Sequence, residues 1–387
     1  MKLRDTPKPL LADEVCDRFG RTFDQLPEGI WRAPGRVNII GEHTDYNEGF
    51  VLPMALSEGV VVCAARRSDH RLVLSSRQAG SAVVELDNLT PGSVTGWAGY
   101  AAGVAWALRQ AGYLVLGASI AIDSDLPVGV GLSSSAALEC AIALALTELS
   151  GVTVPRTELA RIARQAENDF VGVPSGIMDQ TAALLCRAGH ALLIDCRTDC
   201  AAAVSLDLTS ANRCLMIIDT RIRHALTDGK YAERNRECQA AARALGVRSL
   251  RDAAAEEELA SIPSETIRRR ARHVIHENRR VLQAAQLLQE GQLAGIGNLM
   301  TASHTSLRDD FQVSWPEADA AVDAAISAGA DGARMTGGGF GGSVIALVPA
   351  ALSRTVATSA RHRFSENRWQ EPTVTLAAPS GGACRIR

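Results

Sequence analysis

Three short stretches of the 387-residue chain combine residue types that could do chemistry. The first, residues 126–137, places Gly129 and Gly131 before three consecutive serines, with no acidic residue among them. Such glycines let the backbone approach a ligand closely, and a following helix presents unpaired N–H groups at its positive end. This combination favours an anion such as a polyphosphate. A capped helix after a tight turn is the alternative, and no Gly-Lys-Ser/Thr of a Walker A motif follows the glycines.

The second stretch gathers hydrogen-bonding side chains on a predicted turn. Glu42, His43, Asp45 and Asn47 follow Gly41, which ends a short predicted strand. Each sugar hydroxyl needs both a donor and an acceptor, so this density of polar groups suits a polyhydroxylated ligand. A solvated, charged turn is the alternative. A zinc site is disfavoured, because Glu-His-x-Asp lacks the helical i, i+4 spacing of zinc ligands.

The third stretch, residues 172–180, carries Asp179 at the start of a predicted Ala/Leu helix. A carboxylate between apolar neighbours is typical of an active-site group. An acid at a helix N-terminus can also act only as a partner of the helix dipole. The residues of this stretch leave both interpretations open.

A further glycine-rich segment, residues 337–342, formally matches GxGxxG. A nicotinamide oxidoreductase is disfavoured, because a strand rather than a helix is predicted to follow the glycines. So many glycines between two extended segments instead predict a loop that packs closely against another backbone or a ligand.

The elements that must position these stretches are helices and strands in mixed order. An antiparallel sheet is predicted within residues 50–84, and a short strand over 37–40. Buried strands are predicted at 191–195 and 214–219. Helices are predicted over residues 9–25, 97–110, 136–149, 231–245 and 264–290.

Composition narrows the class of protein. Hydrophobic residues make up 47% and charged residues 21%, as in ordinary globular enzymes. The net charge of −3 and the spread of basic residues favour neither a nucleic-acid nor a membrane partner. Nine scattered cysteines without a CxxC pair predict reduced thiols in a cytoplasmic protein. The oligomeric state is not determined by the sequence, and a monomer is compatible with it.

Together these stretches resemble the GHMP small-molecule kinases. Three motifs of that family occur in order, at residues 34–38, 127–137 and 336–342. Within the family, residues 35–47 resemble the galactokinase signature. The resemblance extends from about residue 32 to residue 348, with further matches at Glu167-Asn168, 176–180, the region of Tyr231 and 303–310. Ile39 and Ser175 depart from the usual pattern, and neither removes a catalytic group.

The resemblance implies an α+β, two-lobed fold with the active site in the cleft between the lobes. Residues 1–205 would form the lobe with the sugar signature and phosphate-binding loop. Residues 206–387 would form the lobe with the glycine-rich loop.

The resemblance also implies ATP-dependent phosphorylation of α-D-galactose at its C1 hydroxyl. Asp179 would orient or deprotonate that hydroxyl, and Arg36 beside it would stabilise developing negative charge. Mg²⁺ would bind Ser135 and Glu167, directly or through water. The implied sugar ligands are Glu42, His43, Thr44, Asp45, Gly176 and Tyr231. The implied triphosphate loop comprises Gly129, Val130, Gly131, Leu132, Ser133, Ser134 and Ser135.

Two alternatives share this resemblance. One is a kinase for a related hexose such as N-acetylgalactosamine, because the sequence does not size the pocket around C2. The other is a catalytically silent sugar sensor that signals through a partner. The sensor is disfavoured because such relatives can lack residues of the serine-alanine loop, whereas Ser135-Ala136 is present here together with Arg36 and Asp179.

Overall fold

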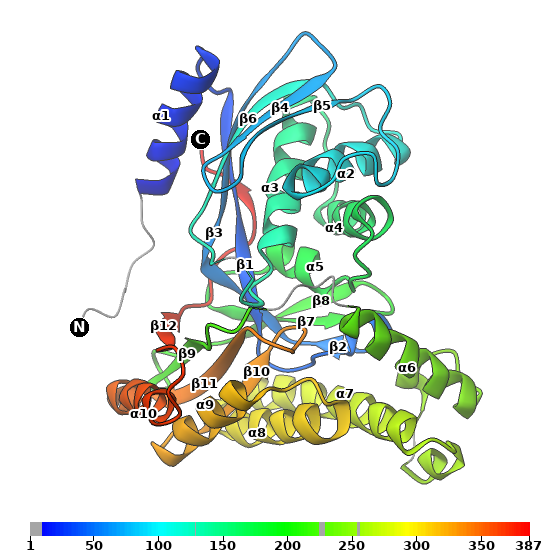
Figure 1. Cartoon of the computed structure of the whole chain (residues 1–387), viewed down its shortest axis with the longest axis vertical. Coiled ribbons are helices and arrows are strands. Elements are labelled where there is room, and N and C mark those ends of the chain that lie inside the picture. Colours follow the sequence, from blue (N-terminus) through cyan, green and yellow to red (C-terminus); the bar gives the residue numbers. More distant parts are fainter. Residues whose placement is uncertain (1–9, 128, 224–228, 254–255) are drawn as a thin grey trace.

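The computed structural model describes residues 10–127, 129–223, 229–253 and 256–387. Figure 1 shows two parts stacked along the long axis of the molecule. The upper part is a long sheet with helices α1–α5, and the lower part is a second sheet over helices α6–α10. The predicted α+β, two-lobed fold is confirmed. The predicted boundary between residues 205 and 206 coincides with the end of strand β8 and stays a prediction.

In the described ranges, six strands form the upper sheet, in the order β13-β1-β3-β6-β4-β5. All neighbouring pairs are antiparallel except β4 and β6, which are parallel. The prediction of an antiparallel sheet within residues 50–84 is therefore right for β4 with β5. The same sheet also contains strands from outside that range. The strands are β1 (Gly29–Asn38), β3 (Pro53–Arg66), β4 (Arg71–Ser76), β5 (Gly80–Glu85), β6 (Ala118–Ser124) and β13 (Cys384–Arg385).

Strand β1 differs from the short strand predicted at residues 37–40. It extends over Gly29–Asn38, although Pro34 lies within it and has no N–H to donate. The register with β3 shifts between Pro34 and Arg36, and this bulge keeps the strand continuous past the proline. Beyond the bulge, the N–H of Arg36 donates to the carbonyl of Leu132 at 3.2 Å. The irregularity thus joins the strand to the glycine-serine loop.

Helices cover both faces of the upper sheet (Figure 1). Helix α1 packs on one face, against β3 and β6, and α3 packs on the other, against β1 and β3. Alanine and leucine dominate α3, so it can form an uninterrupted helix that is buried on most sides. The helices of this part are α1 (Leu10–Phe23), α2 (Trp97–Gln110), α3 (Ser134–Leu149), α4 (Arg156–Gln165) and α5 (Met178–Leu185), with a π-helical turn η2 (Ala166–Val171) after α4.

Two smaller sheets complete the described structure. One has the strand order β10-β11-β9-β12 and the other β2-β7-β8, so β2 leaves the sheet predicted for residues 50–84. Their strands are β2 (Phe50–Val51), β7 (His190–Asp195), β8 (Cys200–Ser205), β9 (Arg213–Asp219), β10 (Gly332–Thr336), β11 (Ser343–Pro349) and β12 (Thr373–Ala377). The lower helices are α6 (Lys230–Leu245), α7 (Glu265–Gln289), α8 (Ile296–Ser306), α9 (Pro316–Ser327) and α10 (Ser353–Glu366).

The β10-β11-β9-β12 sheet lies where the two parts meet, and each of its faces is buried in a different hydrophobic core. Along β9, Met216 and Ile218 lie in the core with the lower helices, whereas Leu215 and Ile217 lie in the larger core under the upper sheet. Alternate residues of a strand point to opposite faces, so one strand contributes to both cores. An apolar contact of this kind fixes the two parts against each other.

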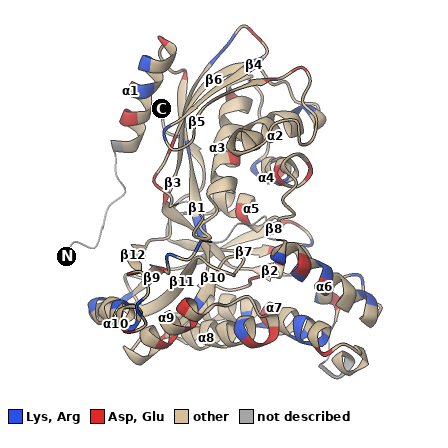
Figure 2. Cartoon of the chain, in the orientation of Figure 1, with Lys and Arg blue, Asp and Glu red and all other residues tan. Residues whose placement is uncertain are grey.

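Charged residues of both signs lie on the outer helices. Figure 2 shows Lys and Arg beside Asp and Glu along α6 and α7. Among the described helices, none is long and apolar enough to cross a membrane. All nine cysteines lie in the described ranges and are free thiols.

Candidate active site

The predicted catalytic residues Arg36 and Asp179 form a two-point ion pair. Arg36 lies on β1 and Asp179 is the second residue of α5. The Nε and Nη2 atoms of Arg36 each donate to a different carboxylate oxygen at 2.8 Å. The arginine is 5% exposed, whereas 25% of the Asp179 side chain is exposed. The carboxylate is therefore fixed by the protein and still accessible to a ligand.

The glycine-serine loop lies against this ion pair. The φ angles of Gly129 and Gly131 are +74° and +78°, a region that favours glycine. Ser133 also has a positive φ of 57°, and its hydroxyl donates to the carboxylate of Asp179. The Nη1 atom of Arg36 donates to the carbonyl of Gly131 at 2.6 Å. The structure thus brings together residues 36, 129–133 and 179, which are far apart in the sequence.

The rest of the loop is anchored by its apolar residues. Val130 and Leu132 are buried, so only their main-chain groups could serve a nucleotide. Ser134 begins α3, where the first N–H groups of a helix are unpaired. A Cβ atom on Gly342 would lie 3.1 Å from the carbonyl oxygen of Val130. The prediction that the glycine-rich segment packs closely against another backbone is confirmed.

Ser135 and Glu167, the predicted Mg²⁺ ligands, are adjacent. The hydroxyl of Ser135 donates to Oε1 of Glu167 at 2.9 Å. Oε2 accepts from Ser175 at 2.6 Å and from the amide of Gln180 at 2.9 Å. Burial raises the pKa of the Glu167 carboxyl, so a nearby cation would relieve the cost of its charge. One hydroxyl and one carboxylate are hard oxygen donors of the kind that Mg²⁺ takes from proteins, and the pair fits this ion.

No group of three or more His, Cys, Asp or Glu that could hold a metal ion occurs among the residues with described positions. Mg²⁺ is commonly held by one or two carboxylates together with substrate phosphates, rather than by an all-protein cage. The Ser135–Glu167 pair is compatible with that mode.

The predicted sugar-binding residues Asp45 and Gly176 are in contact. A Cβ atom on Gly176 would lie 1.9 Å from a carboxylate oxygen of Asp45, so only glycine fits here. Asp45 accepts a hydrogen bond from the N–H of Tyr46 at 2.9 Å. Burial, and secondly the charge of Asp179, raise the pKa of Asp45 to about 6. The predicted sugar turn and the carboxylate of Asp179 therefore interact electrostatically.

His43 and Tyr231 lie in an aromatic cluster. The His43 ring centroid is 5.4 Å from that of Tyr231 and 4.6 Å from that of Phe311. Nδ1 of His43 is 2.9 Å from the hydroxyl of Tyr46. Burial holds the pKa of His43 well below its usual range, so its imidazole is neutral at physiological pH. A neutral imidazole can offer one donor and one acceptor to a ligand.

Glu42 and Thr44 differ from the other predicted sugar ligands, because their side chains are engaged within the protein. The Thr44 hydroxyl lies 2.8 Å from the carbonyl of Gly41 and 2.6 Å from that of Phe50. The Glu42 carboxylate is 2% exposed and accepts from the amide of Gly337 at 2.8 Å. Their assignment as sugar ligands stays a prediction.

Comparisons with known proteins identify the family. The model of the GHMP kinases N terminal domain matches residues 99–187, and that of the GHMP kinases C terminal matches residues 284–366. The galactokinase galactose-binding signature matches residues 17–66. A curated galactokinase of Streptomyces coelicolor is 45% identical over 384 residues, which are 97% of this chain and 99% of that protein. The chain belongs to the galactokinase family. A galactokinase of Mycobacterium tuberculosis is 47% identical over 359 residues, 91% of this chain and 98% of that protein.

The galactokinase family also supplies a solved structure of the same fold. The Lactococcus lactis galactokinase complexed with galactose has a TM-score of 0.92 and 33% identity, covering 97% of this chain and 99% of that one. The galactose-binding signature of the family spans β1, with Arg36, and the turn that carries His43 and Asp45. The sequence resemblance to this family is confirmed.

Sequence reasoning missed several buried polar residues around the site. Arg334 lies on β10 and Glu277 on α7, and both are fully buried. Glu139 lies in the apolar helix α3, and its carboxylate accepts from the same Gln180 amide that donates to Glu167. For Arg334 and Glu139 the available signal was a single charged residue within an otherwise apolar strand or helix face. Such a residue is seldom buried without a partner. Glu277 gave no such signal, because α7 also buries Arg270 and His273.

The raised pKa of Asp45 generates a stability prediction. Between about pH 4 and pH 6 the folded protein keeps a proton on Asp45 that the unfolded chain releases, so this group lowers stability as the pH rises through that window. We expect Asp45→Asn to raise Tm by about 2 °C or more at pH 8, and to give little gain at pH 4. Thermal unfolding of both proteins across this pH range measures the difference. A variant less stable than the parent at pH 8 would contradict this electrostatic account.

Proposed function

We propose that this protein transfers the γ-phosphate of ATP to the C1 hydroxyl of α-D-galactose. The observation that carries the proposal is the contact of Asp179 with both Arg36 and Ser133. One carboxylate is thereby held beside a loop suited to phosphates and beside the turn suited to a sugar. The family membership and the names of the curated relatives support the same activity.

In the proposed reaction, the C1 oxygen of the sugar attacks the γ-phosphorus of ATP. The bond from that phosphorus to the β,γ-bridging oxygen breaks, and galactose 1-phosphate and ADP are formed. Asp179 accepts the hydrogen bond of the C1 hydroxyl and orients or deprotonates it. Arg36 stabilises the negative charge that develops on the attacking oxygen. Phosphoryl transfer needs chiefly positioning and charge neutralisation, and this arrangement supplies both.

The remaining site residues fall on either side of Asp179. Main-chain N–H groups of residues 129–135 and the hydroxyls of the three serines would hold the triphosphate. His43, Asp45, Gly176 and Tyr231 would hold the sugar, with Glu42 and Thr44 fixing or completing that site. Ser135 and Glu167 would hold Mg²⁺. When bound, this ion neutralises phosphate charge.

We also propose that the protein works in the cytoplasm on a small-molecule sugar. Nine free thiols support a reducing compartment.

Phosphorylation rates across a panel of sugars test the proposed substrate. ATP consumption should be fastest with galactose and should depend on it strictly. N-acetylgalactosamine should react more slowly, because its C2 substituent needs additional space. If N-acetylgalactosamine or another hexose reacted faster, that sugar and not galactose would be the substrate. Tight galactose binding without turnover would favour the catalytically silent sensor.

Asp179→Asn should reduce kcat by at least about 100-fold in a protein that still folds, because the amide keeps the shape but loses the charge and basicity. Its Tm should fall somewhat, because the buried Arg36 loses its ionic partner. The matched control is Asp17→Asn, at an exposed position of α1. The control should retain full turnover. A near-normal rate for Asp179→Asn would show that the assigned role is wrong.

Glu167→Gln should raise the Mg²⁺ concentration needed for half-maximal activity, because the carboxylate that would hold the ion loses its charge. Asp169→Asn serves as the control, since Asp169 is exposed on the same π-helical turn. Magnesium titrations at saturating sugar measure both variants. An unchanged Mg²⁺ requirement in Glu167→Gln would count against the assignment.

A further inference from the structure

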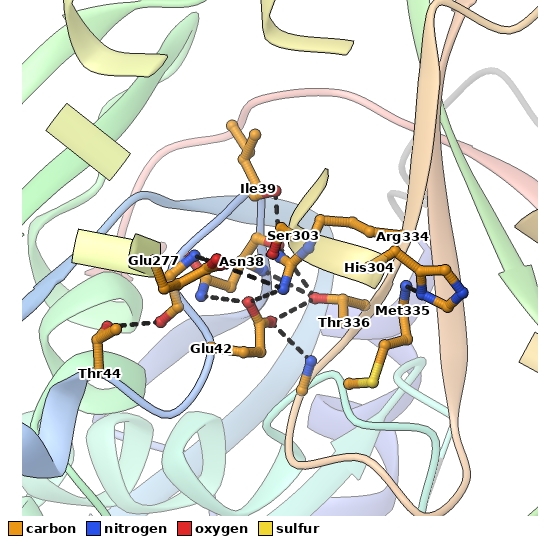
Figure 3. Close-up of polar contacts among 12 residues, drawn as sticks. Asn38, Ile39, Glu42, Thr44, Glu277, Ser303, His304, Arg334, Met335 and Thr336 are labelled. Atoms are coloured by element: carbon orange, nitrogen blue, oxygen red, sulfur yellow. Dashed lines mark hydrogen bonds and ion pairs between the residues drawn. The ribbon is translucent and has the colours of Figure 1, made fainter. Parts of the chain in front are cut away.

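A fully buried arginine connects the predicted sugar turn to the lower part of the molecule. Arg334 lies on β10, directly before the glycine-rich segment, and is 0% exposed. Its Nη1 atom donates to the carbonyl oxygens of Asn38 and Ile39, each at 3.2 Å. Its Nη2 atom lies 2.5 Å from the carboxylate of Glu42. Figure 3 shows the guanidinium between these three groups.

A second buried acid holds the same turn from helix α7. Glu277 is 0% exposed and accepts from the N–H of Gly41 at 3.0 Å and from the hydroxyl of Ser303 at 2.6 Å. It lies 3.8 Å from Arg334, and Arg280 donates to its other oxygen at 2.7 Å. Although burial alone would raise it, the pKa of Glu277 is lowered to about 2, chiefly by Arg280, His273 and Arg334.

The cluster pairs acids with bases. Two acids, Glu42 and Glu277, face two bases, Arg334 and Arg280. Burial raises the pKa of the Glu42 carboxyl, and the charge of Arg334 beside it opposes that rise. Buried charges are tolerated when they are paired and hydrogen-bonded, and removing one partner leaves another uncompensated. The cluster therefore favours one arrangement of the turn.

The Glu42 carboxylate also binds the start of the glycine-rich segment. It accepts from the N–H of Gly337 at 2.8 Å, and the hydroxyl of Thr336 lies 3.1 Å from it. Asn38 donates to its other oxygen at 2.8 Å. These partners come from β1 and from the end of β10, so Glu42 is held on several sides (Figure 3).

We infer that Arg334 is a positioning residue for the sugar site: by binding Glu42 and the carbonyls of Asn38 and Ile39, it sets the place of the turn that carries His43 and Asp45. The inference rests on the proposed function, because it takes that turn to be the sugar-binding one. The guanidinium can bind three acceptors at once through its fixed fork. An ammonium keeps the charge but lacks that geometry, so lysine cannot replace it fully.

Arg334→Lys tests the inference in the full-length protein. We expect the KM for galactose to rise by about tenfold or more, because lysine cannot keep all the contacts of the guanidinium with Glu42 and the two carbonyls. The KM for ATP should stay within about threefold of the parent. A general loss of stability would not separate the two substrates in this way. Arg213→Lys is the control, since Arg213 lies on β9 of the same sheet and pairs with Asp331, just before β10, rather than with the turn. The control should change neither KM.

Thr336→Val provides a second, milder variant if Arg334→Lys does not fold. It removes only the hydroxyl beside Glu42 and Asn38, and the KM for galactose should rise by about threefold. Equal changes in both KM values, or an unchanged KM for galactose, would overturn the positioning role while the parent remains an active galactose kinase. An inactive parent would overturn the proposed function, and this inference with it.

Discussion

The ion pair of Arg36 and Asp179 is the interaction on which the site depends. The two residues are 143 positions apart, and the arginine is almost fully buried. A buried guanidinium needs acceptors for its donors, and Arg36 finds them in Asp179 and in the carbonyl of Gly131. One side chain therefore fixes strand β1, the glycine-serine loop and helix α5 relative to one another. The carboxylate of Asp179 gains its position from the same contacts that satisfy the buried charge.

Close backbone contacts impose the second constraint. Gly342 lies against the carbonyl of Val130, and Gly176 lies against the carboxylate of Asp45. A side chain at either position would separate the segments that form the site. The glycines therefore contribute through the distances they allow between neighbouring segments. The polar groups are concentrated in the space between these contacts, where burial raises the pKa of Asp45 and lowers that of His43. The same close packing that joins the segments therefore also shifts the pKa values of Asp45 and His43, because it removes these groups from water.

Local patterns predicted the parts of the fold that depend on local physics. Helix α2 occupies residues 97–110 as predicted, because its apolar and small residues favour a helix throughout. The family motifs singled out segments far apart in the sequence that the structure brings together around Asp179. The short strand predicted at residues 37–40 covers only the end of β1, because the pairing with β3 and the bulge after Pro34 that extend the strand depend on a distant segment. Arg334 and Glu277 were missed for a related reason: their partners on the sugar turn lie more than 230 positions away, and no local pattern shows such a pairing.

The central claim is that Asp179 faces both the sugar hydroxyl and the terminal phosphate. A crystal structure with galactose and a non-hydrolysable ATP analogue tests this most directly. The account predicts a carboxylate oxygen of Asp179 about 2.6–3.2 Å from the C1 oxygen of the sugar, with the γ-phosphate on the side of residues 129–135. A sugar bound with its C1 hydroxyl directed away from Asp179, or a triphosphate bound outside the glycine-serine loop, would contradict it.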